Sequence, residues 1–401
     1  MTGMALQFIN QRSGYSKPRQ LLWNDLCLTS FPQQLDPEST KLMHRWFFDI
    51  SDVLFPPQFC SKFDMVKSIW VNCVLADEAS SYVDFFERKP GISSKALYHI
   101  SKAYGLVNLK LSGPESVSDN AIAAVVTLAI YQQIHQQHST GLIHLNGLYR
   151  MIQLRGGIAR LMKENRALAL KPLRLDVELA LQNGSPLFRS DAVPVNAVSG
   201  DSRTTKEQPR STAPWFSHIM LDVLNFASLL NGREREGRTK LDPLNYTETL
   251  LSLLYRLIDV APLGQPRSMS GGLYDDVAHL AMLAFMTTLL PEYGRDRSSY
   301  LLLSNRLEST IQDFHVTSAD TPDSGLSLLL WTLFISGVSV LKREDHWWLS
   351  FFILETCERL DLYDWPAVRR QLCEFPWVYT LHDVPGRYLW EDAQRRSPEI
   401  A

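Results

Sequence analysis

The chain has 401 residues, of which 45% are hydrophobic and 21% are charged, and its formal net charge is −3. These proportions are those of an ordinary globular protein, so they exclude wholesale disorder. A net charge so close to zero gives no general attraction to nucleic acid. No break in composition divides the chain into balanced halves, so its length supports one large domain.

The cysteines and the apolar segments bear on where the protein works. Five cysteines are scattered without a Cys-x-x-Cys pair, which fits reduced thiols inside a cell. Residues 1–10 lack the basic region and apolar run of a secretory signal. Residues 324–341 are uncharged and fall just short of the ~20 residues that span a bilayer, and their serines favour a buried central helix. We therefore expect a protein of the cytoplasm or the nucleus without a membrane segment.

The first part of the chain has helical periodicity. Apolar residues at spacings of three and four predict a helix over residues 36–55, with Asp36 as its cap and Pro37 in its first turn. Ser118 is expected to cap a helix that carries apolar residues up to Ile134. Two further helices are predicted around residues 66–74 and 93–109.

The most informative stretch begins at His144. The preceding Ser139-Thr140 opens a helix with one continuous apolar face. Gly147 is expected to let a neighbouring helix approach closely. Arg155-Gly156-Gly157 ends this helix, because glycine adopts the positive φ of a helix C-cap without a Cβ penalty.

A second helix of this stretch is expected to open with Arg174-x-Asp176-x-Glu178. It ends at Gly184-Ser-Pro186-x-Phe188, where glycine and proline act together as a stop. An Arg at the end of a core helix should not lie unpaired against apolar surface. We therefore expect Arg155 or Arg150 to pair with Asp176 or Glu178 in a partly buried contact.

After this stretch, residues 190–214 are rich in Ser, Thr and Pro and predict a surface loop. The rest of the chain is again helical, and Asp242-Pro243 and Asp364 have the character of helix caps. Nothing alternates with period two for long enough to build a sheet, so the predicted fold is all-α, with about 12 to 16 helices. The helices expected in this half cover residues 213–230, 243–260, 273–290, 299–314, 322–341, 344–360 and 365–378.

Searches for catalytic and cofactor motifs are mostly negative. The chain has no Walker loop, Gly-x-Gly-x-x-Gly, Gly-x-Ser-x-Gly or His-Glu-x-x-His motif, so no catalytic residue and no cofactor are predicted. Tyr98 and Lys102 match the Tyr-x-x-x-Lys pair of short-chain dehydrogenases, but without a glycine-rich turn upstream. His135, His138 and His144 are spaced like metal ligands, yet no cysteine or acidic group accompanies them, so no metal site is expected.

The order of motifs along the chain resembles the regulatory domain of fungal-specific transcription factors. Further matches are Leu35-Asp-Pro37, Leu329-Leu-Trp331 and Phe375-Pro376-Trp377. The resemblance implies an all-α regulatory module over residues 31–380, after an N-terminal segment 1–30 and before a tail 381–401, in the nucleus of a filamentous fungus. Within the central block, the residues that carry it are His144, Gly147, Arg155, Gly156, Gly157, Arg174, Asp176, Glu178, Pro186 and Phe188.

One departure from the family bears on function. Its members usually carry an N-terminal zinc cluster in which six cysteines hold two zinc ions and place a helix in the DNA major groove. Five cysteines at other spacings do not build that cluster, so we expect no sequence-specific DNA binding from this chain alone. The leading hypothesis is a regulator that acts as a helical scaffold: it self-associates, binds other transcription regulators, or senses a small-molecule effector.

Two alternatives stay open at this stage. One is a helical enzyme or accessory protein of fungal secondary metabolism, which requires a deep pocket with converging polar groups of perturbed pKa. The other is a truncated gene model of a zinc-cluster transcription factor, which an in-frame cysteine-rich exon upstream of Met1 would reveal.

Overall fold

The part of the chain that the computed structural model describes contains the helices α7 to α18 and no strand. Before α7, residues 101, 104–105 and 107–111 are also helical, which agrees with the helix expected over residues 93–109 as far as that range is described. One isolated bridge joins Cys60 to Leu241. The predicted all-α class is therefore confirmed. The helices expected over residues 36–55 and 66–74 and most of the loop 190–214 lie outside the described residues. These are 56–61, 101, 104–105, 107–134, 137–188, 214–233, 239–265, 272–290, 300–317, 323–341 and 347–400.

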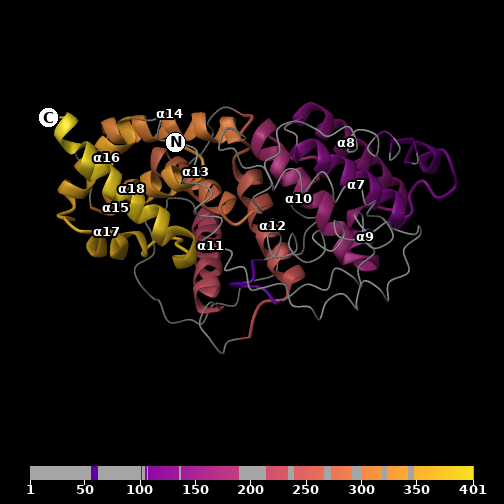
Figure 1. Ribbon diagram of the computed structural model, residues 1–401, viewed down its shortest axis with the longest axis horizontal. Helices are drawn as coiled ribbons and strands as arrows, with labels where there is room; N and C mark the ends of the chain where they lie inside the picture. Colours follow the sequence, from indigo (N-terminus) through magenta and orange to yellow (C-terminus); the bar gives the residue numbers. More distant parts are fainter. Residues whose placement is uncertain are drawn as a thin grey trace, which may run out of the picture.

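The first described helices are α7 (Asp119–Ile134), α8 (His138–Arg155), α9 (Ile158–Glu164) and α10 (Arg166–Asn183). They lie together at one end of the molecule, in purple and magenta in Figure 1. Ser118 caps α7 as predicted, since its hydroxyl accepts the N–H of Ala121 at 3.3 Å. The short α9 was not predicted, because it occupies only the seven residues between Gly157 and Asn165.

Helix α10 is buried on all sides, and it contacts α7, α8, α9, α12 (Pro243–Val260) and α14 (Leu301–Thr317). Its cap is Asn165, whose side chain accepts the N–H of Leu168 at 3.1 Å. The expectation that Arg174 opens this helix is wrong, because the helix begins at Arg166. Pro172 lacks an N–H and usually marks a helix boundary, but burial on every side keeps α10 continuous through it.

The second half of the chain follows the predicted pattern closely. Asp242 and Asp364 cap α12 and α17, and accept the N–H groups of Asn245 at 2.9 Å and Ala367 at 2.8 Å. The ends of α12 are those predicted, and the other helices differ from their predicted ranges at one or both ends. The remaining helices are α11 (Pro214–Arg233), α13 (Leu273–Thr287), α15 (Asp323–Ser339), α16 (Trp348–Arg359), α17 (Trp365–Leu372) and α18 (Tyr379–Ile400).

Helix α15 is the apolar centre of this half. Residues Gly325 to Gly337 are buried without interruption, and α13, α14, α16, α17 and α18 all contact the helix. Gly337 permits this packing, because a Cβ there would lie 2.7 Å from a methyl of Leu389. The prediction of a buried central helix is confirmed. Among the described residues, no helix combines the length and hydrophobicity that a bilayer crossing requires.

The C-terminal segment differs from the expected tail over residues 381–401. Helix α18 packs against α15, α16 and α17, and buries Leu389, Trp390 and Ala393. Pro385 and Gly386 interrupt the helical pattern in the sequence. In the structure Gly386 instead allows α18 to lie against Trp377, whose ring atoms would meet an added Cβ at 3.0 Å.

Gly184 at the end of α10 supplies a test of this packing. Its φ is +101°, and a Cβ there would lie 2.5 Å from Cα of Gly264. Gly184→Ala should therefore lower the free energy of unfolding by about 3 kcal/mol, since backbone strain adds to a clash with backbone. Gly156→Ala is the matched control: its φ is also positive, but its Cβ meets only the movable Arg160 side chain, so it should lose about 1 kcal/mol. Equal losses in urea unfolding would contradict the close contact.

Candidate functional site

The central block of the sequence folds around the buried carboxylate of Asp176, which is only 1% exposed. One carboxylate oxygen accepts the N–H of Leu187 at 2.7 Å. The other accepts the N–H of Phe188 at 2.9 Å and the hydroxyl of Tyr255 at 2.7 Å. Asp176 therefore joins three parts of the molecule: α10, the turn that follows it, and α12.

The turn after α10 is held from two sides. Gly184 takes a left-handed conformation as the C-cap of the helix, as the sequence predicts. Beyond Pro186, the ring of Phe188 is buried and meets the ring of Tyr149 on α8 edge-on, with 5.2 Å between the ring centroids. Pro186 and Phe188 thus belong to a turn that folds back onto α8 and α10.

Burial sets the protonation of this cluster. It raises the pKa of Asp176 to about 6, although the hydrogen bonds from Leu187, Phe188 and Tyr255 act in the opposite direction. Burial and the neighbouring carboxylate of Asp176 also raise the pKa of Tyr255 well above its usual value. The Tyr255 hydroxyl therefore keeps its proton and remains a hydrogen-bond donor to Asp176.

A second set of charges occupies another face of α10. Lys171, Arg174 and Glu178 are spaced three and four residues apart, so they share one side of the helix, and all three are buried. Nε of Arg174 lies 3.4 Å from Oε1 of Glu178. Burial, aided by the charge of Arg174, lowers the pKa of Lys171 to about 7. We call these three residues the α10 charged stripe.

The ends of α7, α8, α9 and α10 meet in a polar network. Arg155, the last residue of α8, forms an ion pair with Asp119 and donates to Oε2 of Glu164 at 2.8 Å. Asn165 donates to the other oxygen of Asp119 at 2.9 Å while it caps α10. Arg155 at the C-terminus of α8 and Asp119 at the N-terminus of α7 also interact favourably with the helix dipoles. This helix-end network fixes where the four helices start and stop.

The predicted pairing of Arg155 or Arg150 with Asp176 or Glu178 is therefore wrong. Arg155 binds Asp119 and Glu164, and Arg150 is exposed on the outer surface of α8. Asp176 is satisfied by N–H and O–H groups, which a buried carboxylate accepts as readily as a cation. Arg155 does have acidic partners, as predicted, but they are Asp119 and Glu164 rather than the acids of α10.

The two first residues of the central block also play other parts than expected. Gly147 faces open space, since nothing lies within 4 Å of an added Cβ, so the expected close approach of a helix there is wrong. His144 stacks beside Tyr104, with ring centroids 5.9 Å apart. Gln132 donates to the Tyr104 hydroxyl at 2.6 Å, and burial lowers the pKa of His144.

Gly156 and Gly157 have φ values of +110° and +91°, which confirms their role as a helix stop.

The described residues offer little direct chemistry. No three His, Cys, Asp or Glu side chains in that part of the chain lie close enough to hold a metal ion, and His135 lies outside it, as do Tyr98 and Lys102. Burial raises the thiol pKa of Cys60 and Cys357 to about 12. These thiols stay protonated at neutral pH and are poor nucleophiles. Asp176 and Tyr255 are closed off from solvent, so they hold structure rather than meet a substrate.

Two distant motifs of the resemblance also meet in space. The indole N–H of Trp331 on α15 donates to the carbonyl of Pro376 at 3.1 Å. Its ring stacks on Phe375 with 5.2 Å between centroids. The following residue, Trp377, donates to Asp383 at 2.8 Å. The Phe375-Pro376-Trp377 motif therefore anchors α15 to α18.

Several residues of these networks were not predicted from the sequence. Tyr255 is 79 residues from Asp176, and Asp119 is 36 residues before Arg155, so no local pattern links either pair. Lys171 had a usable signal, because its spacing from Arg174 and Glu178 places all three on one helical face. Its position beside Pro172, before the expected helix start, concealed that spacing.

No family model matches the chain, and no curated protein or solved structure matches it significantly.

Asp176→Ala tests whether the carboxylate holds the block together. It leaves two buried N–H groups without their acceptor, so we expect a loss of about 3 kcal/mol in the free energy of unfolding. Asp222→Ala is the control, because Asp222 pairs with Arg256 in a half-exposed contact at 2.7 Å and should lose less than about 1 kcal/mol. Similar losses in the two variants, measured by denaturant unfolding, would show that the Asp176 contacts are not special.

The pKa of Asp176 also makes stability depend on pH. Its folded pKa of about 6 exceeds its ordinary value of 3.8, so between these values the native state binds more protons than the unfolded state. The contribution of Asp176 to stability should therefore fall, by about 3 kcal/mol at most, as the pH rises from about 4 to about 6. Asp176→Asn cannot titrate. The difference in unfolding free energy between wild type and this variant should show the fall, and a difference that is flat or rises with pH would contradict it.

Arg155→Met tests the helix-end network. It removes the cation shared by Asp119 and Glu164, and we expect a loss of about 1 to 2 kcal/mol. Arg160→Met is a matched control, because Arg160 is well exposed and pairs with Glu164 alone, so its effect should stay within about 0.5 kcal/mol. If thermal melting of both variants shifts equally, the network does not organise the helix ends.

Proposed function

We propose that this chain is a fungal transcription-regulatory protein that acts in the nucleus as a helical scaffold for other regulators and carries no zinc-cluster DNA-binding module in these residues. The motif order from His144 to Trp377 supports the family. The five cysteines cannot supply the six thiolates of the cluster. The contacts of the motif residues support the scaffold role.

One observation carries the proposal: most of the family-motif residues serve packing, helix ends or buried polar contacts. Asp176 binds the turn at Leu187 and Phe188, and Arg155 closes the helix-end network. Such residues specify a single arrangement of helices rather than a reaction. The protonated thiols of Cys60 and Cys357 point the same way. If the motif residues hold the helices in place, the chain binds other regulators through its surface.

Autonomous DNA recognition is the first measurement. We expect the purified chain to bind fluorescent fungal promoter fragments only weakly at about 50 mM salt and without preference among sequences, because its formal net charge is −3. Unlabelled random-sequence DNA serves as competitor. Tight binding that survives this competitor would overturn the view that the chain depends on partners for its DNA contacts.

Regulatory activity is the second measurement. When the chain is fused to an unrelated DNA-binding domain in a filamentous fungus, we expect a reporter under that domain's operator to change its expression at least about three-fold, in either direction. Asp176→Ala should weaken the change, because it destabilises the scaffold, whereas Asp222→Ala should keep it. Equal nuclear levels of each fusion must be verified. A reporter that does not respond to the wild-type fusion would contradict the proposal.

A further inference from the structure

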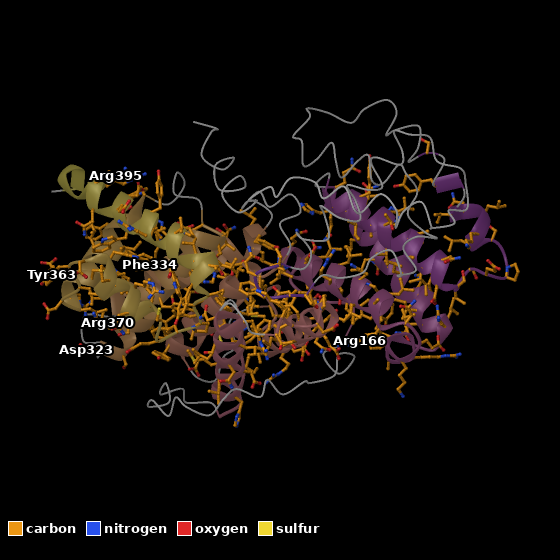
Figure 2. All side chains as sticks on the ribbon, turned by 60° about the horizontal axis from the view of Figure 1, so that its bottom comes forward. Arg166, Asp323, Phe334, Tyr363, Arg370 and Arg395 are labelled. Carbon is orange, nitrogen blue, oxygen red and sulfur yellow. The ribbon has the colours of Figure 1, made fainter. Side chains whose placement is uncertain are left out.

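Helix α16 presents large aromatic side chains to solvent. Trp347, directly before the helix, is 73% exposed, Phe351 one turn later is 39% exposed, and Tyr363 after the helix is 72% exposed. Single exposed apolar residues are common, but an exposed Trp is rare, and Trp is among the residues most often found at binding hot spots. Tyr363 projects from the edge of the molecule (Figure 2).

Trp347 and Phe351 lie on one side of α16. Trp347 already has helical φ and ψ, so Trp347, Phe351 and Glu358 follow one side of the helix at spacings of four and seven residues. Along the axis they span about 16 Å. The chain then reaches Asp361 and Tyr363, and the Tyr363 hydroxyl donates to Asp361 at 3.1 Å. The hydrogen bond to Asp361 and the charges of Asp361 and Glu358 raise the pKa of Tyr363. We call these five residues the α16 ridge.

The ridge rests on a rigid base. On the opposite side of α16, Leu349, Ile353 and Cys357 are buried, and the helix packs on α15 and α18. On a third side, the indole N–H of Trp348 donates to Glu308 of α14 at 3.2 Å. His315 of α14 stacks on Phe352 with 3.7 Å between ring centroids. A surface held this firmly loses little conformational entropy when it binds a partner.

The charge of the ridge selects the kind of partner. Residues 347–364 contain four carboxylates, Glu355, Glu358, Asp361 and Asp364, against the single guanidinium of Arg359, which is a net charge of −3. Glu355 is engaged with His315 at 2.9 Å, and Asp364 caps α17. Glu358 and Asp361 lie between the exposed rings of Phe351 and Tyr363 along the chain.

We propose that the α16 ridge binds a cationic segment of a partner protein, rich in Arg or Lys. The aliphatic stems of such side chains pack on indole and phenol rings, and their charged heads gain from cation–π contact with those rings. Glu358 and Asp361 then accept hydrogen bonds from guanidinium groups, which are stronger than neutral ones. A second copy of this chain fits less well, because two acidic ridges repel each other.

The test measures binding of a defined probe to the full chain. The probe is a fluorescein-labelled peptide of five Arg-Gly-Ser repeats, compared with matched peptides of Glu-Gly-Ser and Gln-Gly-Ser repeats, by fluorescence anisotropy. We expect only the Arg peptide to bind, and its affinity to fall at least about three-fold between about 50 mM and about 300 mM salt.

Variants locate the site. Trp347→Ala should weaken binding of the Arg peptide about ten-fold, because it removes the principal ring. Glu358→Gln should weaken it about three-fold and reduce the salt dependence. Leu154→Ala on α8 and Glu391→Gln on α18 replace similarly exposed residues and should leave binding unchanged. Circular dichroism and melting temperature verify that every variant is folded.

Four results would overturn the inference. These are failure of the Arg peptide to bind, equal binding of the Glu peptide, unchanged affinity in both ridge variants, and a dimer in sedimentation that Trp347→Ala dissociates. The last result would assign the ridge to a second copy of the chain. The inference goes beyond the proposed function and does not depend on it, because peptide binding is measured without DNA or a reporter.

Discussion

The buried carboxylate of Asp176 holds the helices at one end of the molecule to those in its middle. Removing a charge from water costs several kcal/mol, so each hydrogen bond that it accepts must form for the fold to be stable. One set of those bonds comes from the turn at Leu187 and Phe188, and another comes from Tyr255 on α12. Because α10 also contacts α7, α8 and α9, the carboxylate links the helices at one end of Figure 1 to those in the middle.

The two central helices achieve their burial by different physics. Helix α15 is mostly apolar, and the hydroxyls of Ser327, Thr332 and Ser339 bond to carbonyls within the helix, as Thr332 does to the Leu328 carbonyl at 2.8 Å. Its position follows from packing, with Gly337 allowing close contact. Helix α10 instead buries Lys171, Arg174, Asp176 and Glu178. Apolar packing tolerates rearrangement, whereas buried charges have few acceptable partners, so α10 restricts the alternatives more than α15 does.

Local patterns in the sequence predicted local structure well. The cap at Asp242-Pro243 and the following periodicity predicted both ends of α12, and the glycines at 156 and 184 predicted helix stops. Such patterns do not predict long-range contacts. The partner of Arg155 was sought among nearby acids, but it is Asp119, the first residue of α7, while Arg155 is the last residue of α8. Helix α18 was missed because Pro385 and Gly386 are read locally as breakers, although contact with Trp377 favours a small residue there. The α16 ridge was not predicted either, since periodicity shows which residues share a face but not whether another helix covers it.

The groups with strongly shifted pKa values lie in the interior of the molecule. In the part of the chain that the structure describes, Asp176, Lys171 and His279 have strongly shifted pKa values, and all three are buried. Perturbed pKa values often mark active sites, but only where a substrate has access. Here burial is the largest cause of each pKa shift, and in His279 it outweighs the hydrogen bond between a ring nitrogen and the Leu257 carbonyl at 2.7 Å, which raises the pKa. Their buried contacts make the helical framework rigid. A rigid surface loses less conformational entropy when it binds a partner.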